Sequence, residues 1–256
     1  MTWATDYERY RKAHHKKIKE TDAIFEQLAT LHAQAKNDAS VLRLSLDAKA
    51  SVTSGPFSRH GVSRVVVRAA DHDFEALDKL TPFGIFLPDY DELYLYFTSS
   101  HLTADFMVDC LQDFWREVQA SFPHIQTLLL NLDNGPENHS RRTQFMQRLT
   151  EFADNTQLTL HLAYYPPYHS KYNPIERTWG VLEQHWNGSL RDSRQTVLRF
   201  AATMTWKSAS PLVKLVDKVY QTGVALSQQA MSVLERRFQR LPTLGKWFVR
   251  IVPVPY

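Results

Sequence analysis

An almost unbroken apolar run at residues 125–133, Ile-Gln-Thr-Leu-Leu-Leu-Asn-Leu-Asp, sets the strongest limit on the fold of this chain. Such a run is typical of a strand that is covered on both faces, as the strands of parallel sheets are. Apolar runs at residues 41–47 and 158–165 indicate further strands. The sequence therefore predicts a sheet that is buried between layers of helices.

The order of the remaining elements favours a mixed sheet of the α/β class. Thr103 is placed to cap a helix whose apolar stripe contains Cys110, so we interpret that cysteine as a core residue and not as a nucleophile. Three antiparallel strands, followed by alternating helices and parallel strands, would form a mixed sheet with helices on its faces. The expected elements are helical residues 3–36, strands 41–47 and 63–69, exposed turns within 71–92, a hairpin of 83–87 and 92–98, a helix after 103, strand 125–133, helix 141–154, strand 158–165, helices 173–186, 196–206 and 226–241, and an extended segment 246–254.

We divide the chain into an N-terminal helical segment, residues 1–39, and one larger domain with a C-terminal helical extension, residues 40–256. Hydrophobic residues make up 43% of the chain, which is enough for a core of this size. One cysteine excludes an internal disulfide framework and a multi-cysteine zinc site. The first residues are charged where a signal peptide would be apolar, and no run approaches the about 18 apolar residues of a membrane span. We therefore expect a soluble cytoplasmic protein with no membrane partner.

Charge is distributed unevenly along the chain. Residues 1–133 contain 14 Lys and Arg against 19 Asp and Glu, whereas residues 134–256 contain 16 against 8. A basic half favours an anionic partner, and nucleic acid is the first candidate. The alternative is that these charges are spread over solvated faces.

Three acidic residues stand where elements begin or end. Asp47 and Asp133 each close an apolar strand, and Glu176 lies in the first turn of the helix after Asn173. Carboxylates at one sheet edge repel one another unless a cation joins them, and Mg²⁺ accepts such an oxygen set. Each acid also has a structural explanation, because aspartates form turns after strands and a glutamate three residues after Asn173 can close a capping box.

The segment that contains Glu176 resembles a known motif. Residues 164–176, Tyr-Tyr-Pro-Pro-Tyr-His-Ser-Lys-Tyr-Asn-Pro-Ile-Glu, resemble the segment with the third acid of DDE-type transposases of the mariner-like superfamily, in particular the insertion-sequence branch abbreviated ISAzo. The residues that match the string of that branch in register are Pro166, Pro167, Ser170, Lys171, Asn173, Ile175 and Glu176.

The two aspartates fit the same family to different degrees. The second aspartate of the family follows an apolar strand and precedes a turn with glycine, asparagine and a nearby arginine. The matching residues here are Asp133, Gly135, Asn138 and Arg141. The family favours Asp-Thr-Lys at the first aspartate, whereas this chain has Asp47-Ala48-Lys49.

The resemblance implies a ribonuclease H-like fold and an Mg²⁺-dependent polynucleotidyl transferase, with Mn²⁺ as a substitute and two ions held by Asp47, Asp133 and Glu176. Water would cleave one DNA strand, and the released 3′-OH would attack target DNA. The implied partners are transposon ends, target DNA, a second copy of the chain and a separate end-recognition module, and the implied location is the bacterial nucleoid. The candidate DNA contacts are Lys49, Asn138, Arg141, Ser170, Lys171 and Asn173, with Arg142 and Arg148 as further basic residues.

Two alternatives stay open at this point. A decayed or repurposed transposase domain would keep the fold and bind DNA without cutting it, and a structure-directed nuclease would cut without joining strands. About 40 residues precede the first expected strand, which is short for a helix-turn-helix module, so the basic run at 9–19 is interpreted as a possible remnant of one.

Overall fold

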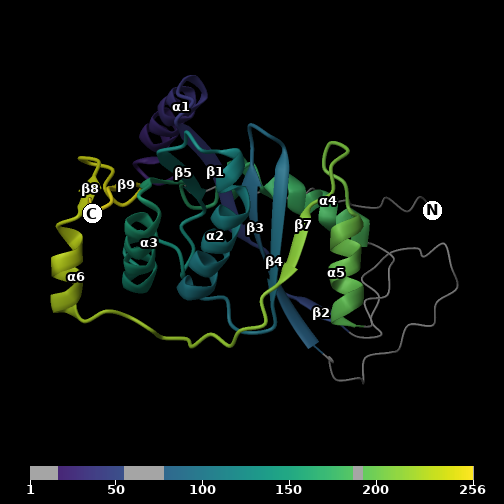
Figure 1. Ribbon diagram of the computed structural model, residues 1–256. Helices are drawn as coiled ribbons and strands as arrows, with labels where there is room; N and C mark the ends of the chain where they lie inside the picture. Colours follow the sequence, from purple (N-terminus) through teal and green to yellow (C-terminus); the bar gives the residue numbers. More distant parts are fainter. Residues whose placement is uncertain (1–16, 55–77, 187–192, 256) are drawn as a thin grey trace, which may run out of the picture.

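The computed structural model describes residues 17–54, 78–186 and 193–255 (Figure 1). In chain order, the elements are α1 (Thr21–Asn37), β1 (Val41–Ala48), β2 (Val52–Ser54), β3 (Asp78–Leu87), β4 (Glu92–Thr98), α2 (Ala104–Val118), the 3₁₀ turn η1 (Gln119–Ser121), β5 (Thr127–Leu132), α3 (Thr143–Thr156), β6 (Thr159–Tyr164), the 3₁₀ turn η2 (Ser170–Tyr172), α4 (Glu176–Trp186), α5 (Arg194–Thr203), β7 (Leu212–Leu215), α6 (Gln228–Glu235), β8 (Phe238–Arg240) and β9 (Phe248–Ile251). The strands lie in the order β7-β4-β3-β1-β5-β6-β9-β8, and β2 pairs with β3 off this path.

The predicted mixed α/β sheet is confirmed. Strands β1, β3 and β4 are antiparallel neighbours, and β5 and β6 continue the sheet in parallel from the other side of β1. Strand β5 lies within the apolar run of residues 125–133, and its residues from Leu128 to Leu132 are all buried. Burial on both faces explains why this run shows no alternation of apolar and polar residues.

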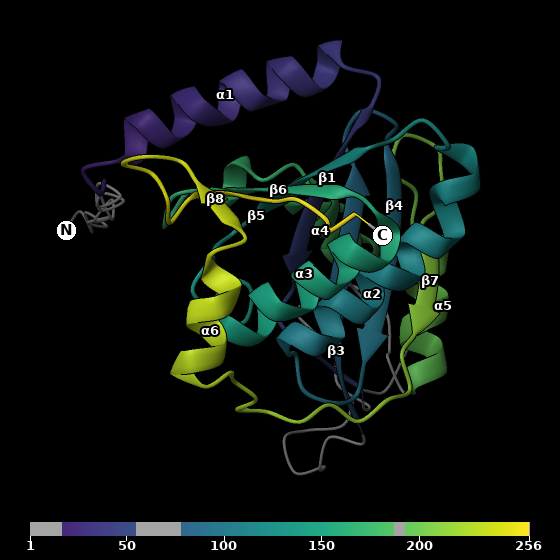
Figure 2. The same ribbon diagram turned by 60° about the vertical axis from the view of Figure 1, so that its left-hand side comes forward.

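Helices cover both faces of the sheet (Figures 1 and 2). Side chains alternate along β3, so that Phe83 and Ile85 join the core beneath α2 and α3, while Phe86 joins a second core with α4 and α5. Thr103 caps α2 as predicted, since its hydroxyl accepts from the Phe106 amide, and Cys110 is buried. Within the described ranges, no helix is both long and apolar enough to cross a membrane.

Helix α1 lies across one side of the sheet in Figure 2. It contributes to the core that α2 and α3 cover. Its residues Ile24, Leu28 and Leu31 are buried at the three- and four-residue spacing of a helix face. The division of the chain after residue 39, and the interpretation of residues 9–19 as a remnant, stay predictions, and positions 1–16 lie outside the described residues.

Several expected elements differ from the structure. Residues 78–82 were expected as exposed turns but begin β3, because Leu80 is buried and pairs with Val52 of β2. The helix expected at 226–241 ends at Glu235, and the chain then enters β8, which pairs with β9. Backbone pairing with a neighbouring strand outweighs the local helical pattern there. The strand expected at 63–69 lies outside the described residues.

Candidate active site

Asp47 and Asp133 lie level with each other at the carboxyl edge of two parallel strands. The register pairs Ser45 of β1 with Asn131 of β5, and each aspartate comes two residues later in its chain. Asp47 is buried within β1, whereas Asp133 follows β5 and is half-buried. The predicted convergence of the two strand ends therefore follows directly from their pairing.

Glu176 is brought to this edge by a buried polar clamp between α4 and β1. The Ser45 hydroxyl donates to Asn173 Oδ1 at 2.5 Å and accepts from the Ile175 amide at 3.0 Å. Asn173 Nδ2 donates to the carbonyl of Leu46 at 3.1 Å. Because these contacts fix the residues just before α4, the helix begins at Glu176 next to the end of β1.

The capping-box explanation of Glu176 is wrong, because the side chain of Asn173 is bonded to β1. Asn173 directs both ends of its side-chain amide at β1 and does not cap the helix. Helix α4 begins at Glu176 itself, and among the described residues the Glu176 carboxylate has no hydrogen-bond partner. The carboxylate is therefore half-buried at the sheet edge with its oxygens available to a ligand.

Trp179, one turn after Glu176, holds the first aspartate. Its indole Nε1 donates to Asp47 Oδ2 at 2.8 Å, and the ring is buried. The ring reaches Asp47 across Gly84, which is the pairing partner of Asp47 on β3. A Cβ atom on Gly84 would lie 2.6 Å from Ile175 Cδ1 and 2.9 Å from Trp179 Cη2. Glycine is therefore needed at this position for the ring to pass.

The three acids act on one another electrostatically. Burial, and next the negative charges of Asp133 and Glu176, raise the pKa of Asp47 to about 8, although the hydrogen bond from Trp179 opposes this rise. With this raised pKa, the Asp47 carboxyl group keeps its proton near neutral pH unless a cation binds next to it. Such mutual repulsion is the condition that a cation between the three groups would relieve.

Asp133 is held by the turn that follows it. Its Oδ1 accepts from the Gly135 amide at 3.2 Å and from Asn138 Nδ2 at 2.8 Å. Tyr164 donates its hydroxyl to the carbonyl of Asn138 at 2.8 Å and so fixes this turn to β6. The Oδ1 atom of Asn138 is buried and has no partner among the described residues.

The oxygens around Gly135 suit a hard cation. A Cβ atom on Gly135 would lie 3.2 Å from Asn138 Oδ1 and 3.3 Å from Asp133 Oδ2, so carboxylate and amide oxygens converge on a space that the missing side chain leaves open. Across the described ranges, however, no three His, Cys, Asp or Glu side chains are gathered closely enough to hold a metal ion. These oxygen donors fit Mg²⁺ or Mn²⁺. The three carboxylates would have to move closer to one another to enclose such an ion.

The predicted DNA contacts fall into two groups. Asn138 and Asn173 are buried and have the structural roles described above, whereas Ser170 and Lys171 are exposed. Lys49 forms an ion pair with Glu183 at 3.1 Å. Arg142 and Arg148 also form ion pairs within the chain. Arg142 pairs with Glu137, and Arg148 pairs with Asp105 and Asp109.

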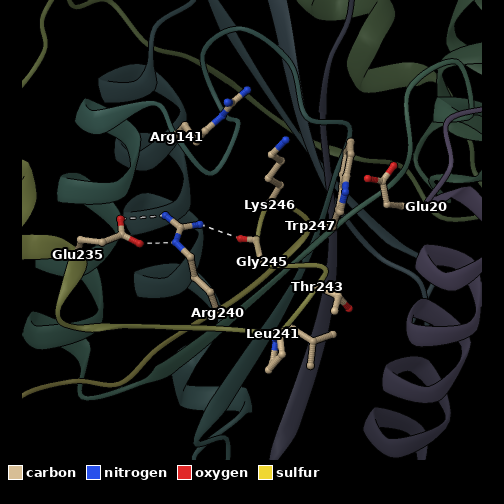
Figure 3. Close-up of a pocket in the computed structure, with 10 residues that line it drawn as sticks. Glu20, Arg141, Glu235, Arg240, Leu241, Thr243, Gly245, Lys246 and Trp247 are labelled. Atoms are coloured by element: carbon tan, nitrogen blue, oxygen red, sulfur yellow. Dashed lines mark hydrogen bonds and ion pairs between the residues drawn. The ribbon is translucent and has the colours of Figure 1, made fainter.

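Arg141 is exposed and lines a pocket beside the turn after Asp133 (Figure 3). Arg240 also lines this pocket, and its guanidinium binds Glu235 and donates to the carbonyl of Ser140 at 3.0 Å. Ser140 in turn donates its hydroxyl to the carbonyl of Lys246 at 2.7 Å. Among the described residues, the side chains of Arg141 and Lys246 form no ion pair, so both charges are available to an anion.

Sequence reasoning missed Ser45, Gly84 and Trp179. The spacing of Trp179 from Glu176 places both on one side of α4, which is a signal that the sequence does contain. Ser45 and Gly84 give no local signal, because their roles depend on elements that are distant in the chain.

Comparison with solved structures defines the class of fold. The chain resembles the Mos1 transposase paired-end complex with left transposon end, with a TM-score of 0.51 and 12% identity over 78% of this chain and 57% of that chain. The crystal structure of the Mos1 mariner paired end complex with Mn gives a TM-score of 0.49 and 11% identity over 78% and 58%. The chain thus has a ribonuclease H-like fold and spans rather more than half of the Mos1 chain.

The family is shown by the sequence match. The model of the Rhodopirellula transposase DDE domain matches residues 6–253, which is nearly the whole chain, and the chain belongs to this family. The search of curated proteins finds no match.

Proposed function

We propose that this transposase domain cuts and joins DNA strands, with Asp47, Asp133 and Glu176 as the ligands of divalent cations. The observation that supports this most is the electrostatic coupling of three acids that come from β1, the end of β5 and the start of α4. We assign two Mg²⁺ ions as the natural cofactor and Mn²⁺ as a substitute, because the donor atoms are hard oxygens.

The residues of this chain prepare the site in distinct ways. Asp47 must lose its proton to bind a cation, and its raised pKa means that cation binding releases a proton near neutral pH. Trp179 fixes Oδ2 of Asp47, and Asn138 fixes Oδ1 of Asp133, so that each aspartate presents one defined oxygen. When bound, the cations would lower the pKa of water and stabilise the charge that develops on the phosphate oxygens.

The proposed reaction has two steps. In the first, water attacks a phosphodiester and leaves a 3′-OH and a 5′-phosphate. In the second, the 3′-OH attacks a phosphodiester of target DNA and displaces a 3′-OH from it, so one bond forms for each that breaks. The positive charge of Arg141 and Lys246 beside the turn after Asp133 supports DNA as the substrate.

We further propose that the domain acts as a homodimer on DNA, that a separate module recognises the transposon ends, and that the protein associates with the bacterial nucleoid. The basic half of the chain, residues 134–256, supports binding to DNA over a wide surface.

Nicking of supercoiled plasmid DNA tests the chemistry without knowledge of the transposon ends. We expect nicking by the wild type with Mg²⁺ or Mn²⁺, none with EDTA, and none by Asp133→Asn. Asp89→Asn is the matched control, because Asp89 is an exposed acid in the turn between β3 and β4. Metal-independent nicking, or equal nicking by Asp133→Asn, would exclude the proposed site.

One observation favours the non-catalytic DNA-binding protein as the second candidate. The chain has Asp47-Ala48-Lys49 at the first aspartate, where the family favours Asp-Thr-Lys. That candidate predicts salt-dependent DNA binding without cleavage in any divalent metal. A nuclease on the same fold would nick DNA but would not join a 3′-OH end to a second DNA molecule.

A further inference from the structure

Two exposed tyrosines lie in the connection between β6 and α4, where it leads to Glu176. Tyr168 is 67% exposed and Tyr172 is 53% exposed, and both belong to the small group of large apolar side chains that the described residues leave in solvent. Two exposed aromatic rings within one short connection offer a surface on which a ligand can stack.

This aromatic pair is tied to the edge that carries the acids. Tyr172 immediately precedes Asn173, whose side chain is bound to Ser45 and Leu46, and Asp47 is the next residue of β1. The segment that carries both tyrosines is therefore attached to the sheet edge that carries the acids.

The backbone and the neighbouring rings hold the tyrosines in place. Tyr168 adopts φ of +65°, a left-handed conformation that is unfavourable for a residue with a bulky side chain. The Tyr172 ring contacts Phe25 of α1 edge-on at 5.1 Å and stacks on His169 at 6.0 Å. The Tyr172 ring is exposed and is supported by its neighbours, so it is organised in advance for a ligand.

A positive charge accompanies the rings. The Lys171 ammonium lies 5.2 Å from the centre of the Tyr172 ring, and the Lys171 side chain is exposed. Among the described residues Lys171 has no ion-pair partner, so it can bind a phosphate. Aromatic faces together with an unpaired cation are the features that bind single strands, since a base stacks on the ring and the backbone meets the charge.

We propose that Tyr168 and Tyr172 form a stacking platform for unpaired DNA bases next to the strand that is cut, with Lys171 on the adjoining phosphate. The inference rests on the proposed function, because it assigns the form of DNA that this site accepts. Stacking requires no particular base, so the platform favours frayed or single-stranded DNA over duplex without reading sequence.

Binding in EDTA separates the platform from the chemistry. Fluorescence anisotropy with a short labelled single strand, and with the duplex of the same sequence, is measured for the wild type and for Tyr168→Ala, Tyr168→Phe and Tyr168→Gly. We expect Tyr168→Ala to bind the single strand about tenfold more weakly and the duplex equally well, while Tyr168→Phe keeps its affinity. Glycine adopts φ of +65° without strain, so Tyr168→Gly removes the ring without distorting the turn and should behave as Tyr168→Ala does.

Tyr90→Ala is the matched control. Tyr90 is 51% exposed but lies in the β3–β4 turn, which the pairing of Ser45 with Phe86 places at the opposite end of β1. Removal of the Tyr90 ring should change neither the affinity for the single strand nor the affinity for the duplex. A wild type that does not bind the single strand, equal binding by Tyr168→Ala, or an equal loss for single strand and duplex would overturn the platform. Absence of nicking with a preserved Tyr168 effect would instead contradict the proposed chemistry alone.

Discussion

Trp179 Nε1 donates a hydrogen bond of 2.8 Å to Oδ2 of Asp47, and this bond connects the helix that begins with Glu176 to the strand that carries the first aspartate. The bond lowers the pKa of Asp47 against the effect of burial. It also fixes the position of Oδ2 of Asp47.

We therefore expect Trp179→Phe to fold but to nick DNA about 10–100-fold more slowly, as is typical when a hydrogen bond behind a metal ligand is removed. Loss of the donor raises the pKa of Asp47 further, so the pH at which nicking reaches half its maximum should move upward. Rates measured across pH test this, and an unchanged profile would show that the indole only fills space.

Gly84→Ala tests the close approach of α4 to β3. The added methyl group would lie 2.6 Å from Ile175 Cδ1, so we expect a loss of about 1–3 kcal/mol in the free energy of unfolding and a displaced Trp179 ring. Gly180→Ala is the control within α4, where a Cβ atom meets nothing within 4 Å. That substitution should stabilise the helix by up to about 1 kcal/mol. Urea unfolding measures both.

The buried clamp between Ser45 and Asn173 gives a third prediction. Asn173→Ala removes the acceptor of the Ser45 hydroxyl hydrogen and one donor to the Leu46 carbonyl, and each such loss at a buried group costs about 1–3 kcal/mol. We expect a lower melting temperature and loss of nicking, because Glu176 is no longer held beside β1. Asn37→Ala, at the exposed end of α1, should leave both unchanged. Full nicking activity in Asn173→Ala would refute a positioning role for the clamp.

The pKa of Asp47 predicts how stability depends on pH. Its folded-state pKa is about 8 against an ordinary value of 3.8, so between these values the folded protein binds more protons than the unfolded chain does. The contribution of Asp47 to folding stability therefore falls as pH rises from about 4 to about 8. Asp47→Asn removes this dependence, and in EDTA it should be more stable than the wild type by at least about 1 kcal/mol near pH 8 and nearly equal near pH 4. Denaturant unfolding at both pH values tests this, and the same difference between Asp47→Asn and the wild type at pH 4 and pH 8 would contradict a raised pKa of Asp47.

The fold, and the placement of two of the three acids at one sheet edge, could be predicted because the relevant signals are local. A strand buried on both faces has an unbroken apolar sequence, and the carboxyl ends of parallel neighbours share an edge, which places Asp47 level with Asp133. The family motif pointed to Glu176, but only the contacts of Asn173 with β1 explain why it reaches this edge.

The remaining features depend on packing between distant segments. The need for glycine at position 84 arises from the Trp179 ring, which lies nearly a hundred positions later in the chain. The start of β3 was not predicted because acidic residues dominate the window 71–92. Leu80 is the apolar residue among the first five of β3, and it pairs with β2. Such pairings are set by the tertiary structure and leave little trace in a single sequence.

Calorimetric titration with Mn²⁺ tests the central claim that the three acids form one cation site. The wild type, Asp133→Asn and the control Asp89→Asn are titrated without DNA at about pH 8, where Asp47 can lose its proton. We predict binding with proton release in the wild type and in Asp89→Asn, and an affinity at least about tenfold lower in Asp133→Asn. Equal binding in all three proteins, or no binding in the wild type, would contradict the account.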